Sequence, residues 1–135
     1  MAEEFRLLIV DDEDDFREAL VKRLEKRNVD VWSAETGRRA LDLVEKMAFD
    51  VVVLDVKMPG MGGIETLEQI KKKKPLVEVI LLTGHASVEA GIEGMKLGAF
   101  DYVMKPVNID ELLNKVRQAY ERKVIQEIKP LIERP

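Results

Sequence analysis

Short runs of consecutive apolar residues alternate along this chain with longer stretches in which apolar residues recur every three or four positions. The runs predict buried β-strands, and the longer stretches predict amphipathic helices. The predicted strands are residues 5–10, 29–34, 50–54, 78–82 and 100–104. The predicted helices are residues 15–27, 37–47, 63–73, 87–97 and 109–128.

This regular alternation of strand and helix predicts an α/β fold. Repeated strand–helix–strand units with short links produce a parallel sheet with right-handed crossovers. Five strands and five helices favour a doubly wound sandwich, because a barrel of eight units needs a much longer chain. Residues 29–34 alternate apolar and polar side chains, which is typical of an edge strand with one wetter face.

Capping signals locate several helix ends. Asp15 with Glu18, and Asn108 with Glu111, both have the spacing of a capping box. Pro130 predicts the end of the last helix, because proline cannot donate the backbone hydrogen bond that a helix interior requires.

Three glycines mark the region of the fourth predicted helix. Gly98 stands where a left-handed C-cap is expected. Gly91 and Gly94 lie inside the helix, and each lowers helix stability by up to ~1 kcal/mol relative to alanine. We therefore expect residues 87–97 to form a less stable helix than their neighbours.

Composition restricts the classes of function. A chain of 135 residues, 46% hydrophobic and 36% charged, is typical of one soluble globular domain, here residues 1–128, with 129–135 as a tail or severed linker. The absence of cysteine excludes disulfides, thiolate catalysis and cysteine-based zinc sites. The net charge of −4 gives no general reason to bind nucleic acid or a membrane surface. No apolar run approaches the ~20 residues of a membrane span, and we expect a cytoplasmic protein.

Chemically active residues follow four of the predicted strands. Because the carboxyl ends of parallel strands share one edge of the sheet, these residues should meet in one cleft. They are Asp11 and Asp12 after the first strand, Asp55 after the third, Thr83 after the fourth and Lys105 after the fifth.

Three carboxylates in one cleft predict a bound cation. Two unit charges ~4 Å apart repel by ~4 kcal/mol at an effective dielectric constant of ~20, so a cation is needed to hold the group together. No cysteine or histidine accompanies Asp11, Asp12 and Asp55, which favours a hard, oxygen-binding ion such as Mg²⁺, for which Mn²⁺ can substitute.

The same residues suit phosphoryl chemistry. The Asp55 carboxylate, already ionised at neutral pH, can attack phosphorus and become an acyl phosphate. Lys105 can neutralise charge on the phosphoryl oxygens, and the Thr83 hydroxyl can donate a hydrogen bond to one of them.

These residues and their surroundings resemble the receiver domain of two-component response regulators over about residues 5–125. The resemblance rests on LIVDDE at residues 8–13, VLDVKMPG at 53–60, LTGHA at 82–86 and GAFDYVMKP at 98–106. It implies a flavodoxin-like (βα)5 sandwich, with five parallel strands in the order 2-1-3-4-5. It also implies that a sensor histidine kinase or phosphotransfer protein phosphorylates the chain.

The resemblance further implies roles for individual residues. Asp55 is the phosphoacceptor. Mg²⁺ is bound by Asp12, Asp55 and the backbone carbonyl of Lys57, with Asp11 helping, often through water. The peptide bond between Lys105 and Pro106 is cis.

In this family, phosphorylation is read out as a conformational switch. The resemblance implies that Thr83 moves toward the phosphoryl group and that Tyr102 turns inward behind it. The signal then appears on the face formed by 87–97, 100–104 and 109–128. A homodimer through this face, or through the long last helix, is the association we expect.

Two nearby side chains are candidates for setting the lifetime of the phosphorylated state. Lys57 lies two residues after Asp55, and His85 lies two residues after Thr83. Both can border the path of an attacking water molecule. The alternative is that both simply point into solvent.

Two other classes of protein share parts of this pattern. Phosphatases of the haloacid-dehalogenase type also use an aspartate nucleophile, Mg²⁺, a threonine or serine and a lysine, but they carry a second acid where this chain has Lys57. A pseudo-receiver that only binds protein would lack some of the acids, which are all present here. We expect a self-phosphorylating and self-dephosphorylating switch rather than an enzyme that turns over an external substrate.

Overall fold

The computed structural model describes residues 3–84 and 87–133, and it contains a parallel sheet in the order β2-β1-β3-β4-β5. This order confirms the predicted flavodoxin-like sandwich. The strands are β1 (Arg6–Val10), β2 (Asp30–Ala34), β3 (Val51–Asp55), β4 (Glu78–Thr83) and β5 (Asp101–Met104).

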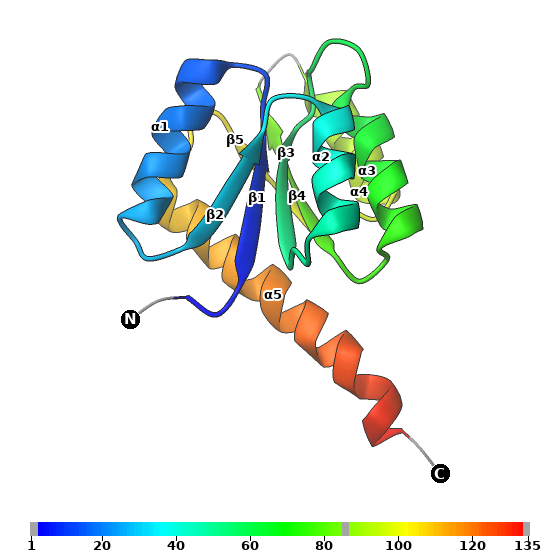
Figure 1. Cartoon of the computed structure of the whole chain (residues 1–135). Coiled ribbons are helices and arrows are strands. Elements are labelled where there is room, and N and C mark those ends of the chain that lie inside the picture. The colour runs from blue at the N-terminus through cyan, green and yellow to red at the C-terminus, as the bar shows by residue number, and fades with distance from the viewer. Residues whose placement is uncertain (1–2, 85–86, 134–135) are drawn as a thin grey trace.

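Five helices cover the two faces of the sheet (Figure 1). They are α1 (Asp14–Glu25), α2 (Gly37–Lys46), α3 (Gly63–Lys73), α4 (Val88–Lys96) and α5 (Ile109–Ile132). Helices α1 and α5 pack on one face, and α2, α3 and α4 pack on the other. Each face buries its own apolar cluster, so the sheet lies between two hydrophobic layers.

The burial of each strand follows its position in the sheet. All residues of β3 and β4 are buried, as their nearly unbroken apolar sequences predict for central strands covered on both sides. Strand β2 pairs only with β1 and exposes three of its five residues. The prediction of an edge strand at 29–34 is therefore confirmed.

The two predicted capping boxes have different outcomes. The Asn108 side chain accepts a hydrogen bond from the Glu111 backbone N–H at 3.0 Å, as predicted. The prediction for Asp15 is wrong, because α1 begins at Asp14 with Glu13 as its N-cap and no side-chain cap. The Glu13 backbone N–H donates instead to the Asp11 carboxylate at 2.9 Å, and this bond sets where the chain enters the helix.

The predicted helix end at Pro130 is also wrong, because α5 continues through it to Ile132. The end of α5 projects beyond the sheet (Figure 1), where water can satisfy the carbonyl that proline leaves unpaired. The helix exposes a group of apolar side chains there: Ile125, Ile128, Leu131 and Ile132. Within the described residues, no helix combines the length and the hydropathy required to cross a bilayer.

The glycines of α4 allow close packing against the sheet. A Cβ atom at Gly94 would lie 2.3 Å from Leu81 Cδ1, and one at Gly91 would lie 3.1 Å from Thr83 Cγ2. Gly91 and Gly94 have low helix propensity, but their lack of a side chain permits the tight contact between α4 and β4. The expected low stability of α4 stays a prediction. Gly98 has a φ of 105°, the left-handed conformation expected at that helix end.

A glycine at the start of α3 fixes how closely that helix approaches the end of β3. A Cβ atom at Gly63 would lie 2.3 Å from the Asp55 carbonyl oxygen and 2.6 Å from Val56 Cα. We expect Gly63→Ala to destabilise the protein by at least about 2 kcal/mol, because backbone atoms cannot move aside as a side chain can. Urea denaturation measures the change.

The neighbouring Gly62 provides a matched control. A Cβ atom there would have only the Met58 carbonyl oxygen nearby, at 3.9 Å, and the φ of −68° suits any residue. Gly62→Ala should change the free energy of unfolding by less than about 1 kcal/mol. Equal effects of the two substitutions would contradict the packing argument.

Candidate functional site

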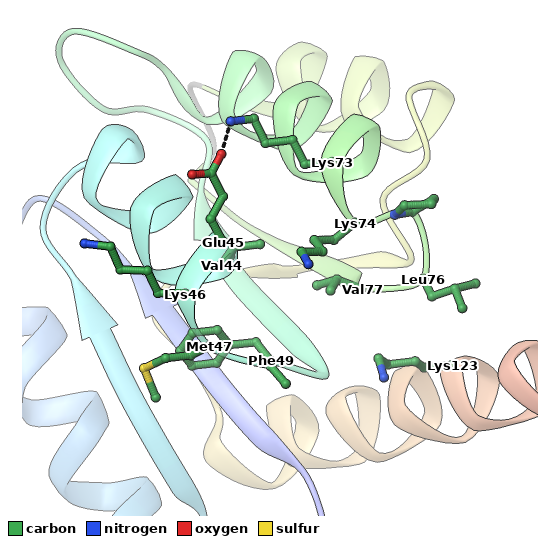
Figure 2. Close-up of a pocket in the computed structure, with 12 residues that line it drawn as sticks. Val44, Glu45, Lys46, Met47, Phe49, Lys73, Lys74, Leu76, Val77 and Lys123 are labelled. Carbon is green, nitrogen blue, oxygen red and sulfur yellow. Dashed lines mark hydrogen bonds and ion pairs between the residues drawn. The ribbon is translucent and has the colours of Figure 1, made fainter.

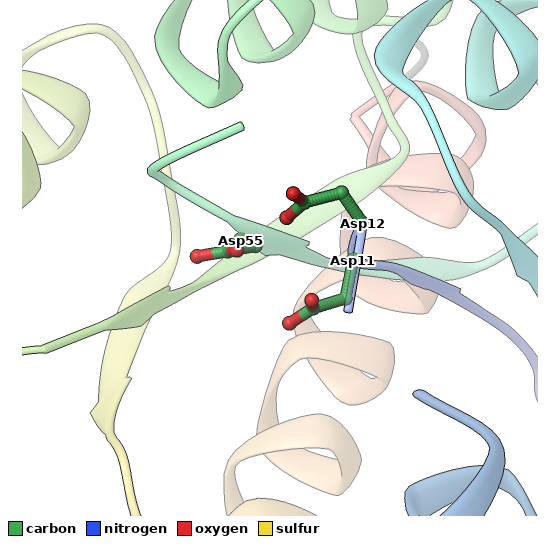
Figure 3. Close-up of side chains that lie close together, drawn as sticks. All are labelled: Asp11, Asp12 and Asp55. Carbon is green, nitrogen blue, oxygen red and sulfur yellow. The ribbon is translucent and has the colours of Figure 1, made fainter. Parts of the chain in front are cut away.

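Three carboxylates lie together at the carboxyl edge of the sheet. Asp11 and Asp12 follow β1, and Asp55 ends β3 (Figure 3). One oxygen from each lies within 4.8 Å of the others. Asp11 and Asp55 are buried, with 0% and 5% of their surface exposed, whereas Asp12 is open to solvent. The predicted acidic cluster is therefore present, with one side open to a ligand.

Hydrogen bonds hold the loop that carries Asp11. Its backbone N–H donates to the Ala34 carbonyl at 3.2 Å, which extends the pairing of β1 with β2. Buried Arg17 donates to the Asp11 carbonyl at 2.8 Å and to the Asp14 carboxylate at 2.7 Å. Sequence reasoning missed Arg17, although its position three residues after Asp14 on α1 is the spacing of a helical ion pair.

The Asp55 side chain is held at the end of β3 by the turn that follows. Its Oδ1 accepts a hydrogen bond from the Lys57 backbone N–H at 3.3 Å. The Val56 backbone N–H donates to the Leu82 carbonyl at 3.1 Å, so the chain stays paired with β4 just past Asp55. The roles predicted for the Lys57 carbonyl and side chain stay predictions.

Lys105 reaches the acids from the end of β5. Its Nζ lies 3.0 Å from Asp11 Oδ2, 3.6 Å from Asp55 Oδ2 and 3.3 Å from Glu13 Oε1. The ammonium also lies 4.4 Å from the centre of the Phe16 ring. The peptide bond that follows Lys105 is cis, as predicted for the bond to Pro106. Glu13 and Phe16 are neighbours of the lysine that sequence reasoning did not identify.

The predicted switch residues lie on the two neighbouring strands β4 and β5. Thr83 ends β4 and is buried, and its hydroxyl donates to the Met104 sulfur at 3.1 Å. Tyr102 on β5 is 45% exposed, with the Lys115 ammonium 5.3 Å from its ring centre. His85 lies outside the described residues, so its predicted role stays a prediction.

Burial and repulsion change the protonation of the site. Burial raises the pKa of Asp55 from 3.8 to about 6, and the charge of Asp11 adds to the increase, although Lys105 opposes it. Burial lowers the pKa of Lys105, but its hydrogen bond to Asp11 and the charge of that carboxylate outweigh burial and raise it overall. One ammonium therefore compensates only part of the negative charge.

The donor set fits a hard divalent cation. Three oxygen ligands converge, and burial together with the charge of Asp11 raises the pKa of Asp55 even though Lys105 lies nearby. Carboxylate oxygens with room for water are the ligands that Mg²⁺ prefers. Asp11, Asp12 and Asp55 are thus suited to hold such an ion.

A cavity of about 450 Å³ lies elsewhere, between the ends of α2 and α3 and the side of α5 (Figure 2). Phe49 and Val77 contribute to its apolar wall, and lysines surround it, including Lys73, which pairs with Glu45. None of the acidic or strand-end residues of the candidate site lines it. The residues predicted from the sequence for phosphoryl chemistry therefore lie outside this cavity.

Comparison with known families gives a match over most of the chain. A family model described as "Response regulator receiver domain" matches residues 7–117. This segment includes the three acids, Thr83, Tyr102 and Lys105.

Curated relatives match the chain over a similar length. The regulatory protein AtoC of Escherichia coli (strain K12) is 40% identical over 116 residues, which cover 86% of this chain and 25% of AtoC. The DNA-binding transcriptional regulator NtrC of Klebsiella pneumoniae is 37% identical over 111 residues, covering 82% of this chain and 24% of NtrC. The chain thus spans about a quarter of the length of these relatives.

Solved structures share the fold. The receiver domain of the Francisella response regulator 1452 has a TM-score of 0.80 and 34% identity, covering 88% of this chain and 98% of that one. The receiver domain of NtrX from Brucella abortus has a TM-score of 0.81 and 30% identity, covering 85% and 98%.

The raised pKa of Asp55 predicts that Asp55→Asn stabilises the metal-free protein near pH 8, by up to ~3 kcal/mol. Since the pKa in the folded state, about 6, exceeds the ordinary value of 3.8, the folded protein binds more protons than the unfolded chain between these values. Stability therefore falls as pH rises from about 4 to about 6, and the full penalty is present above that range. Asparagine removes the penalty.

Urea denaturation with a chelator, at about pH 8 and at about pH 4, measures this effect. Most of the stabilisation should disappear at the lower pH, where Asp55 is protonated in the folded state and only partly ionised in the unfolded chain. Asp42→Asn, at an exposed position on α2, is the control and should be close to neutral at both. An effect of Asp55→Asn that does not depend on pH would contradict the electrostatic origin.

Proposed function

Since this chain belongs to the response regulator receiver domain family of two-component systems, we propose that it accepts a phosphoryl group on Asp55. The donor is the phosphohistidine of a sensor histidine kinase or of a phosphotransfer protein. Since the chain spans about a quarter of the length of AtoC and NtrC, the proposal concerns the receiver function alone.

The arrangement around Asp55 carries the proposal. Its carboxylate lies among the oxygens of Asp11 and Asp12, within 4.8 Å, and its Oδ2 is 3.6 Å from the Lys105 ammonium. A nucleophilic carboxylate next to a cation site and a fixed ammonium has the parts that phosphoryl transfer requires.

The transfer exchanges one bond to phosphorus for another. An Asp55 carboxylate oxygen attacks phosphorus as the bond from phosphorus to the histidine nitrogen breaks, and the electron pair of that bond stays on the imidazole. The product is an aspartyl phosphate. Lys105 lies where its charge can stabilise the phosphoryl oxygens, and no separate base is needed because the attacking group is a carboxylate.

Asp12 and Asp55 are the residues we propose as direct ligands of Mg²⁺ or Mn²⁺, together with the Lys57 backbone carbonyl. Asp11 helps, in part through water. When bound, the ion neutralises negative charge on the carboxylates and on the phosphoryl oxygens.

Thr83 and Tyr102 are the proposed switch residues. Thr83 is buried at the end of β4, whereas Tyr102 is half exposed on the neighbouring strand β5. A cavity of about 220 Å³ lined by both residues and by α4 offers space for their rearrangement. The change would be read out on the face formed by α4, β5 and α5.

We propose two surfaces for association with a second copy of the chain. One is the α4–β5–α5 face, where Val88, Ile92 and Tyr102 are exposed. The other is the projecting end of α5, with its exposed isoleucines and Leu131. Sedimentation with and without beryllofluoride tests both surfaces, because a monomer under both conditions would contradict them.

Acetyl phosphate with Mg²⁺ should add one phosphoryl group to the protein, and intact-mass spectrometry should detect it. Asp55→Asn should abolish the addition, because an amide cannot act as the nucleophile. Asp12→Asn should reduce the rate at least about tenfold by weakening the cation site, and a chelator should stop the reaction.

The exposed Asp42→Asn variant controls for a general loss of negative charge and should react at the unmodified rate. Labelling at another residue, or no labelling of the unmodified protein, would reject the proposal. In the second case the chain would be a pseudo-receiver. Turnover of a general phosphate ester would instead favour a phosphatase.

The lifetime of the phosphorylated state should depend on Lys57 and His85. We expect Lys57→Asn or His85→Ala to change the rate of phosphoryl loss by about two- to tenfold, because each alters the approach of water to the aspartyl phosphate. Loss of the added mass over time gives the rate. Unchanged half-lives in both variants would mean that these side chains only face solvent.

A further inference from the structure

The Thr83 hydroxyl is held by a partner that the proposed function does not use. It donates to the Met104 sulfur at 3.1 Å, and Thr83 is only 2% exposed. Thr83 and Met104 are paired in the register between β4 and β5, so their side chains stand side by side on one face of the sheet. The contact is therefore built into the strand pairing.

The rest of Thr83 is also closely surrounded. Its carbonyl accepts a hydrogen bond from the Lys105 backbone N–H at 2.8 Å. On the other side α4 passes close by, since a Cβ atom at Gly91 would lie 3.1 Å from Thr83 Cγ2. The backbone and the methyl group are thus confined, and rotation about the Cβ–Oγ1 bond is the movement by which the O–H can change its acceptor.

A sulfur acceptor makes that exchange easy. A thioether is a weak acceptor, whereas a phosphoryl oxygen forms a charge-assisted hydrogen bond that is roughly twice as strong as a neutral one. Met104 is also flexible and lines the cavity of about 220 Å³ next to Thr83, so it can move once it is released. The contact is strong enough to satisfy a buried hydroxyl and weak enough to be displaced.

Resting on the function proposed above, we propose that Met104 is a positioning residue that holds the Thr83 hydroxyl until Asp55 carries a phosphoryl group. The hydrogen bond stabilises the unphosphorylated arrangement only. Breaking this hydrogen bond costs free energy. That cost is part of the free-energy difference between the unphosphorylated and the switched arrangement, which phosphorylation must supply.

Beryllofluoride with Mg²⁺, as a mimic of the phosphoryl group, tests this role by calorimetric titration. Met104→Leu keeps the side-chain volume but removes the acceptor, so the variant should bind beryllofluoride about two- to tenfold more tightly than the unmodified protein. Its affinity for Mg²⁺ alone should not change. Met95→Leu is the matched control, because Met95 lines the same cavity and makes no described hydrogen bond with Thr83.

Two further variants separate positioning from a general change in packing. Met104→Gln restores an acceptor in a side chain of similar length, and its affinity for beryllofluoride should return to the original value or fall below it. In a Thr83→Ala background, Met104→Leu should have no effect, because the hydroxyl is absent. Thermal unfolding monitors whether each variant is folded.

Each outcome has a defined meaning. Equal or weaker binding by Met104→Leu, or an effect that persists with Thr83→Ala, would overturn the positioning role. Failure of the unmodified protein to bind beryllofluoride would instead reject the proposed function of Asp55. If Met104→Leu does not fold, the Met104→Gln result decides, and binding tighter than that of the unmodified protein would then overturn the proposal.

Discussion

Repulsion among three carboxylates at one edge of the sheet is the constraint on which the rest of the structure depends. Burial of Asp55 beside Asp11 raises its pKa to about 6, although Lys105 lies close to both. The unfavourable charge is offset by two large apolar layers and by the hydrogen bonds that hold the acidic loop. The imbalance that costs stability also makes the edge receptive to a cation.

Much of this edge could be predicted from the sequence, because which residues meet there depends only on the order and direction of the strands. Parallel strands bring their carboxyl ends together whatever the details of packing, so Asp11, Asp55, Thr83 and Lys105 were placed correctly from strand ends alone. The supporting residues were harder to find. Phe16 contacts Lys105 and Arg17 binds the Asp11 carbonyl only because α1 is oriented toward the edge of the sheet. That orientation is set by tertiary packing, which the sequence pattern does not reveal.

The errors at helix ends have a related cause. The capping rule placed Asp15 by local spacing, but the Asp11 carboxylate binds the Glu13 N–H and starts the helix one residue earlier than predicted. Pro130 was taken as a stop, but the cost of an unpaired carbonyl is small where water reaches it. Gly91 and Gly94 show the reverse case, in which residues unfavourable for a helix permit a close contact with β4. In each case the free energy of packing or of solvation outweighed the local preference of the residue for or against a helix.

The unbroken length of α5 has a mechanical consequence. The helix contacts the rest of the domain as far as Lys123, whose ammonium pairs with Asp50, and then runs to Ile132 without interruption, a free length of about 13 Å at 1.5 Å per residue. The projecting part of α5 therefore moves as a rigid extension of the part that packs on the sheet. A tilt of about 10° at the sheet would displace the far end by about 2 Å, given that length. A small change in the packing of α5 on the sheet would therefore be enlarged at the tip of the helix.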